Sequence, residues 1–204
     1  YSNAGSNTQI GLFTPNGLAY DSTNQRLFVV DKTDNRVVTF DVTSITDGEN
    51  AINVLGQSNF VTATAATTQG GMNVPTGAYY DSTRGYLFVA QNTGNRVTVY
   101  DVNTITNGEN AINVIGQPDF TTTTAATTQA GMNIPYDVTY DTTNKILFVS
   151  QDAGNRITTY NLSTGITNGQ NATNVIGQSN FTNTALGNTQ TGLNAPRGIA
   201  YDNT

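Results

Sequence analysis

The side chains of this chain that could do chemistry are carboxylates, amides and a few arginines. The 204 residues contain no His and no Cys. The commonest general base, the commonest nitrogen ligand for metals and all thiolate chemistry are therefore absent. Carboxylate pairs such as Asp137 and Asp141 have no partner base that the sequence brings to them. We predict no catalytic residues, no bound metal, no cofactor and no enzyme activity.

Two turn segments carry the oxygen ligands that Ca²⁺ prefers. One contains Asp31, Asp34 and Asn35, and the other is the Asp-Gly-Glu-Asn sequence of residues 47–50. Neither segment has the length or the number of oxygens of a known calcium loop. The carboxylates of the second segment are also lost in its copy at residues 168–171. We interpret both segments as plain turns.

An arginine recurs after an asparagine in three copies of one motif. Such a set could form a ring that binds a ligand, but a structural role is favoured, because an Arg–carboxylate pair can hold neighbouring units in register. A buried arginine without partners would be costly. The predicted structural network consists of Asp21, Asn35, Arg36, Asp81, Asn95, Arg96, Asp141, Asn155 and Arg156.

Two sequence features point to the surface of the folded chain. Asn161, Asn171 and Asn180 match the acceptor pattern for N-glycosylation, although chance matches are expected in a chain rich in Asn and Thr. A long Thr-rich loop spans residues 58–73. We interpret it either as an extended segment packed over the next unit or as a surface for self-association or O-glycosylation. A glutamine near the end of this loop recurs in each repeat, which predicts that the end of the loop is ordered.

The composition excludes several partners. Charged residues make up 11% of the chain, against an ordinary share of roughly 25%, while 36 Thr and 27 Asn take their place. The net charge of −6 argues against nucleic acid, and no apolar run is long enough to insert into a membrane. We expect an extracellular or cell-surface protein. The chain starts at Tyr1, so we expect it to be processed, truncated or part of something longer.

A unit of about 60 residues repeats along the chain. Its marker is a Pro followed five and six residues later by Tyr-Asp, which occurs at Pro15, Pro75, Pro135 and Pro196. Each unit holds four short β-branched or aromatic runs separated by Asp, Asn, Gly and Thr, which is typical of strands and turns. In the first unit these runs are residues 15–20, 26–30, 36–40 and 51–55. The second run is apolar almost throughout, which predicts burial on both faces.

Four-stranded sheets that repeat in this way predict an all-β chain built as a β-propeller, because each sheet buries its faces against its neighbours. A parallel β-helix would need shorter coils. We expect one partial propeller over residues 1–204, with blades at about 14–57, 75–117 and 135–178 and the first strand of a fourth at 196–204.

The turn motif resembles the signature of the NHL-repeat family. It reads Asp-Lys-Thr-Asp-Asn-Arg-Val at residues 31–37 and returns at 91–97 and 151–157. Asn194 and Leu193 stand where the family has its name-giving pair, whereas the usual His is missing. The Gly-Gln segments at residues 56, 116 and 177 look like those of bacterial and archaeal secreted members. This resemblance implies six blades, of which the chain supplies about half.

Residues 182–204 repeat residues 1–23. Neither end of the chain therefore lacks a strand that the other end could supply to close the ring. We therefore interpret the chain either as a piece of a longer repeat protein or as a subunit that assembles with copies of itself. The predicted function is a structural, scaffold or adhesive protein of a filament or matrix. The alternative is a propeller that binds a protein or glycan through exposed tyrosines, although most of these are more simply core residues. The candidate contacts are Tyr79, Tyr80, Tyr100, Tyr136, Tyr140 and Tyr160.

Overall fold

Each repeat folds into one antiparallel sheet whose four strands follow chain order. The computed structural model describes residues 8–203. The first sheet contains β1 (Pro15–Asp21), β2 (Arg26–Asp31), β3 (Arg36–Asp41) and β4 (Asn53–Leu55). The second contains β5 (Pro75–Asp81), β6 (Tyr86–Gln91), β7 (Arg96–Asp101) and β8 (Asn113–Ile115). The third contains β9 (Pro135–Asp141), β10 (Ile146–Gln151), β11 (Arg156–Asn161) and β12 (Asn174–Ile176).

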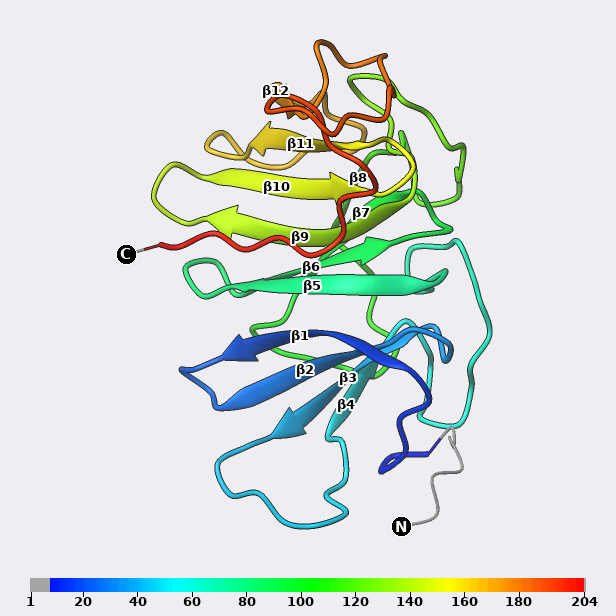
Figure 1. The fold of residues 1–204 in the computed structure, drawn as a ribbon. Helices are drawn as coiled ribbons and strands as arrows, with labels where there is room; N and C mark the ends of the chain where they lie inside the picture. Colours follow the sequence, from blue (N-terminus) through cyan, green and yellow to red (C-terminus); the bar gives the residue numbers. More distant parts are fainter. Residues whose placement is uncertain (1–7, 204) are drawn as a thin grey trace.

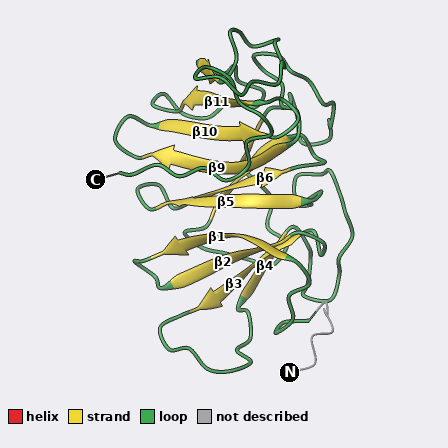
Figure 2. Cartoon of the chain, in the orientation of Figure 1, coloured by secondary structure: helices red, strands yellow, loops and turns green. Residues whose placement is uncertain are grey.

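The three sheets stand side by side as blades, with their first strands β1, β5 and β9 adjacent at the inner side (Figure 1). All regular structure among the described residues is strand (Figure 2). The described part of the chain thus contains no helix that is long and apolar enough to cross a membrane. This arrangement confirms the predicted all-β fold of propeller blades. The ring is not closed.

The second strand of each blade supplies apolar side chains to both faces of its sheet. Successive side chains of a strand point to opposite faces. Phe28 and Val30 therefore pack toward the second blade, while Leu27 and Val29 face away from it. The predicted burial on both faces is confirmed for this strand.

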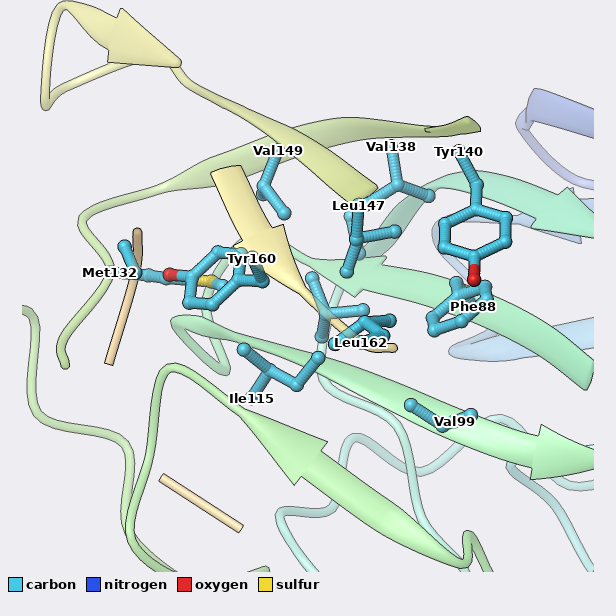
Figure 3. Close-up of a cluster of buried hydrophobic side chains, with 13 residues drawn as sticks. Phe88, Val99, Ile115, Met132, Val138, Tyr140, Leu147, Val149, Tyr160 and Leu162 are labelled. Atoms are coloured by element: carbon cyan, nitrogen blue, oxygen red, sulfur yellow. The ribbon is translucent and has the colours of Figure 1, made fainter. Parts of the chain in front are cut away.

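The apolar core lies between the blades (Figure 3). Phe88, Val97 and Ile115 of the second blade meet Leu147 and Tyr160 of the third. The equivalent positions of the first two blades form a second cluster with the same pattern. Each blade therefore depends on the next one to bury its apolar side chains.

The fourth strand of each blade and the strand expected at residues 196–204 differ from the prediction. The fourth strand of each blade has three residues, because the Ala51 amide bonds to the Gln9 carbonyl instead of a strand partner. The Gln9 side chain also donates to the Ala51 carbonyl at 2.7 Å, and Gln69 and Gln129 repeat this contact, which confirms the ordered loop end. Residues 196–203 run along the third blade without strand hydrogen bonds, and residue 204 lies outside the described part.

The inner strands approach one another so closely that one repeat position requires glycine. A Cβ on Gly77 of β5 would stand 2.7 Å from the Asp137 Cα of β9 and 2.8 Å from the Tyr136 carbonyl oxygen. A Cβ on Gly17 would similarly meet the second blade. A Cβ on Gly198, at the same repeat position, meets nothing within 4 Å. The missing side chain at Gly77 therefore sets the spacing of the inner strands.

We predict that Gly77→Ala lowers the free energy of unfolding by about 1–3 kcal/mol, because an added methyl group forces two backbones apart. Gly198→Ala is the matched control and should change it by less than about 0.5 kcal/mol. Urea unfolding followed by circular dichroism measures both. Equal effects of the two substitutions would contradict the close approach of β5 and β9.

Candidate functional site

A buried arginine at the start of the third strand holds the loops on either side of each blade. The Arg96 guanidinium donates to the carbonyls of Thr68 (3.1 Å) and Gly71 (3.0 Å), which precede the second blade. It also donates to the Phe120 carbonyl (2.5 Å), which follows that blade, and to the Gln91 side chain (3.0 Å). One side chain thus joins the loop that enters a blade to the loop that leaves it.

The same arrangement recurs with different partners in the other blades. Arg156 donates to the carbonyls of Thr128, Gly131 and Phe181 and to the Gln151 side chain. Arg36 also donates to the carbonyls of Gly11 and Phe60, but its side-chain partners are two carboxylates, Asp31 at 3.1 Å and Asp34 at 3.0 Å. Burial lowers the pKa of Arg96 and of Arg156. All three arginines are fully buried and engaged in these contacts, which leaves no donor open to a ligand. Their structural role stays a prediction, and this burial favours it over a ligand-binding ring.

The asparagine before each arginine connects one blade to the next. Asn35 adopts a left-handed conformation (φ 51°), which Asn tolerates better than most residues. Its side-chain nitrogen donates to the Ala63 carbonyl (3.1 Å), and its side-chain oxygen accepts from the Val74 amide (2.9 Å), one residue before β5. Asn95 and Asn155 repeat both contacts. The asparagine therefore sets the position at which the next blade begins.

The predicted single network is wrong in one respect, because its aspartates lie at the other end of the blades. Asp21 ends β1 and pairs with Arg26 at 2.6 Å, whereas Arg36 stands opposite Asp31. Asp81 likewise pairs with Arg84 at 2.7 Å. Two separate networks result. Strands β1 and β3 both pair antiparallel with β2 and run in the same direction, so the last residue of β1 and the first residue of β3 lie at opposite ends of the sheet.

The other polar segments singled out by sequence act as turns and loop contacts. Within the described residues, no three or more acidic side chains gather in a way that could hold a metal ion. The Thr-rich loop is tied down by Gln57, whose side-chain nitrogen donates to the carbonyls of Asn35 and Thr64, both at 2.9 Å. The candidate glycosylation residues Asn161, Asn171 and Asn180 are all exposed, and their occupancy remains a prediction.

Most of the tyrosines considered as ligand contacts belong to the core. Tyr100, Tyr140 and Tyr160 are fully buried, which confirms the simpler interpretation for them. Burial raises the pKa of the Tyr140 and Tyr160 hydroxyls to about 12. Tyr79 and Tyr80 are half-buried against neighbouring blades. Tyr136 is half-buried as well and lies under the Arg197 guanidinium. These side chains do not form one exposed aromatic surface.

The two outer faces of the blade stack carry exposed apolar side chains. Tyr80 and Tyr140 each lie against a Phe of the preceding blade, with ring centroids 5.8 Å and 5.6 Å apart. Tyr20, at the same repeat position of the first blade, is 53% exposed. At the opposite end, Ile176 is 48% exposed while its counterparts Leu55 and Ile115 are fully buried. Sequence reasoning missed these faces, although aligning the repeats already identifies the residues that have no neighbouring unit.

Residues 196–203 cover part of the outer face of the third blade. Tyr201 stacks on Phe148 at 5.5 Å and donates to Asp141 at 2.8 Å. The Ile199 amide donates to Asp137, and Asn203 donates to the Tyr140 carbonyl. This segment therefore lies against the third blade as β5 lies against the first blade and β9 against the second. Unlike β5 and β9, it is not followed by three further strands of a sheet within the described residues.

A hollow of about 460 Å³ lies along the inner strands. It runs between β1, β5, β9 and the segment that ends at Tyr201, and Tyr79 and Asp137 are among its lining residues. Burial raises the pKa of Asp137, although amides of Ile199 and Val138 donate to its carboxylate. The hollow is open, so it could admit a ligand from the axis side of the blades.

Comparisons with known proteins identify the fold. No protein-family model matches the chain, and no curated protein matches its sequence. A solved structure of hydrazine synthase from Kuenenia stuttgartiensis is similar with a TM-score of 0.54 and 12% identity, over 84% of this chain and 38% of that one. A nidogen/laminin complex is similar with a TM-score of 0.47 and 19% identity, over 74% of this chain and 45% of that one.

This chain therefore spans less than half of either solved chain. At 12% identity the first likeness concerns the fold alone. Together with the three adjacent four-stranded sheets, it identifies the chain as part of an all-β propeller.

We predict that Arg96→Met lowers the free energy of unfolding by about 3 kcal/mol or more, because it leaves several buried carbonyls without a donor. Arg197→Met is the matched control. That side chain is 61% exposed, so the same substitution should cost less than about 1 kcal/mol. Chemical denaturation measures both variants. A loss at Arg96 no larger than that at Arg197 would refute the role of the buried guanidinium.

We also predict an acid-dependent loss of stability at Asp141. Hydrogen bonds from the Asn144 side chain and amide, with that of the Tyr201 hydroxyl, lower the pKa of this carboxyl to about 2, against an ordinary value of 3.8. The folded state holds the proton less tightly, so the contribution is complete above about pH 4 and is lost as the pH falls toward 2.

Asp141→Asn should therefore show a shallower loss of stability than the parent between pH 4 and pH 2, measured by urea unfolding at several pH values. Asp119, whose pKa is also about 2, titrates in both proteins and cancels in the comparison. Identical pH profiles for parent and variant would count against the proposed hydrogen bonding.

Proposed function

We propose that the chain is a structural or scaffold repeat protein of the extracellular space or cell surface, with no enzyme activity. Its end faces would join it to further copies or further repeats. The observation that carries this proposal is the exposed apolar side chains at the two ends of the stack, where Tyr20 and Ile176 have no further blade against them within residues 8–203. Apolar surfaces of this kind on a folded domain mark interaction sites.

The repeated polar residues support a structural role over catalysis. The buried arginines bond to main-chain carbonyls of adjoining loops, and Asn35 and its copies bond to the start of the next blade. Nearly identical blades suit regular assembly, because a specific ligand site would need blades that differ. We further propose the NHL type for these blades, on the strength of the Asn-Arg turns at residues 35, 95 and 155.

A second candidate function is binding of a protein or glycan. The observation in its favour is the hollow along β1, β5 and β9, with Tyr79 and the half-buried Asp137 at its surface. A tyrosine ring beside a carboxylate offers both stacking and hydrogen bonding to a sugar. The net charge of −6 disfavours RNA as the ligand.

Electron microscopy of the native material, with antibody labelling of this chain, tests the first proposal. We expect label on continuous extracellular filaments or matrix, because open apolar end faces favour association. Dispersed single particles would contradict it. A glycan array and a pull-down provide the second arm: a specific glycan or protein that loses affinity on Asp137→Ala would favour the binding module instead.

A further inference from the structure

The turn between the third and fourth strands of each blade contacts the outer edge of the preceding blade. In the second blade this turn is residues 104–110. The Ile105 carbonyl accepts from the Asn53 side chain (3.2 Å), and the Asn107 side chain accepts from the Val54 amide (3.1 Å). The Gly108 amide then donates to the Val54 carbonyl (3.0 Å). Both outward main-chain groups of Val54 are satisfied, so the turn caps β4.

The third blade repeats this cap on the second. The carbonyl of Ile166 accepts from Asn113 at 3.1 Å, Asn168 accepts from the Val114 amide at 3.0 Å, and the Gly169 amide donates to the Val114 carbonyl at 3.1 Å. Ile105 and Ile166 also pack against the apolar clusters that their blades share with the preceding one. The cap is thus a repeated interface with one apolar contact and three hydrogen bonds.

The first blade carries the same turn, and within residues 8–203 no blade lies in front of it. Residues 44–50 keep the left-handed glycine, with φ of 74° at Gly48 against 72° at Gly108. They also keep the internal bond from the Thr46 amide to the Glu49 side chain (3.4 Å), which is 3.0 Å in the second blade. Yet Ile45 is 78% exposed, and a Cβ on Gly48 would meet nothing within 4 Å. The turn is therefore already in its binding shape.

The matching edge is open at the other end of the stack. Asn174 is exposed and Val175 is half-buried, whereas the equivalent Val54 and Val114 are fully buried beneath their caps. Unpaired main-chain groups on an edge strand are a template for association. The chain therefore contains both halves of an interface that it forms twice internally.

We propose that the turn at residues 44–50 of one copy of this chain caps β12 of a second copy. Ile45 would pack on the outer face of the third blade, Asp47 would accept from the Val175 amide, and Gly48 would donate to the Val175 carbonyl. The incoming β1 would take the place of residues 196–203, with Tyr20 replacing Tyr201 on Phe148. This contact deepens the proposed function, on which it rests, and joins copies head to tail.

Sedimentation velocity of the full chain over a range of concentrations tests the contact. Ile45→Asp should weaken association at least about tenfold, because it places a charge in an apolar contact. Ile112→Asp is the matched control and should leave association unchanged, because Ile112 is 40% exposed and lies outside the proposed contact. Tyr201→Ala should strengthen association about threefold to tenfold by loosening the competing segment.

Engineered cysteines test the register directly, because the chain has no cysteine of its own. Asn168 and Asn113 touch at 3.3 Å within the chain, and positions 47 and 174 are their equivalents across the proposed contact. A mixture of Asp47→Cys and Asn174→Cys chains should form a disulfide-linked pair under mild oxidation. A mixture of Asp47→Cys and Ile112→Cys chains should not.

A chain that stays monomeric at every concentration, including the Tyr201→Ala variant, would overturn this inference. Association that ignores Ile45→Asp, or that falls equally with Ile112→Asp, would overturn it as well. In these cases native filaments labelled by electron microscopy would still support the scaffold function, so the two failures are distinguishable. Association on the turn with the expected disulfide would support it, whether the product is a closed pair or a longer chain.

Discussion

A four-stranded sheet with apolar side chains on both faces cannot bury them by itself, and the rest of the structure follows from this constraint. The second strand of the middle blade supplies such side chains to both neighbouring blades. Removing this area from water stabilises the stack by roughly 25 cal/mol per Å². Because each blade relies on its neighbours, the middle blade is packed on both faces, while the outer faces of the first and third blades keep exposed side chains such as Tyr20 and Ile176. The same interaction thus explains both the core and the candidate interaction surface.

Polar contacts determine how the stacked blades are aligned. The buried arginines join the loops before and after each blade, and Asn35 and its copies place the first residues of the next one. The turn that caps each outer edge adds a third contact between blades. Apolar packing alone is tolerant of small shifts, whereas hydrogen bonds to buried main-chain groups have a defined length and direction. Regular stacking of these blades therefore depends on a few repeated polar side chains.

The partner of the buried guanidinium differs between blades. All three arginines donate to main-chain carbonyls, but Arg36 also faces two carboxylates, whereas Arg96 and Arg156 face a glutamine oxygen. A buried cation surrounded by neutral acceptors remains costly, but many well-placed acceptors offset the loss of water. This pattern suits a residue whose role is to hold loops, because three of its contacts in the inner blade are carbonyls of the adjoining loops.

The sequence by itself determined the repeat, the four strands of each blade and the burial of the second strand, because these follow from the spacing of apolar side chains and turn residues. It also predicted that Arg36 and its copies are structural. The prediction that they form one network with Asp21 was wrong, because the sequence does not show at which end of the sheet the last residue of a strand lies. Only the tertiary structure decided which side chains cap a neighbouring blade. Ile45 and Ile105 have nearly the same local sequence, and their difference in exposure arises from whether another blade lies in front of them.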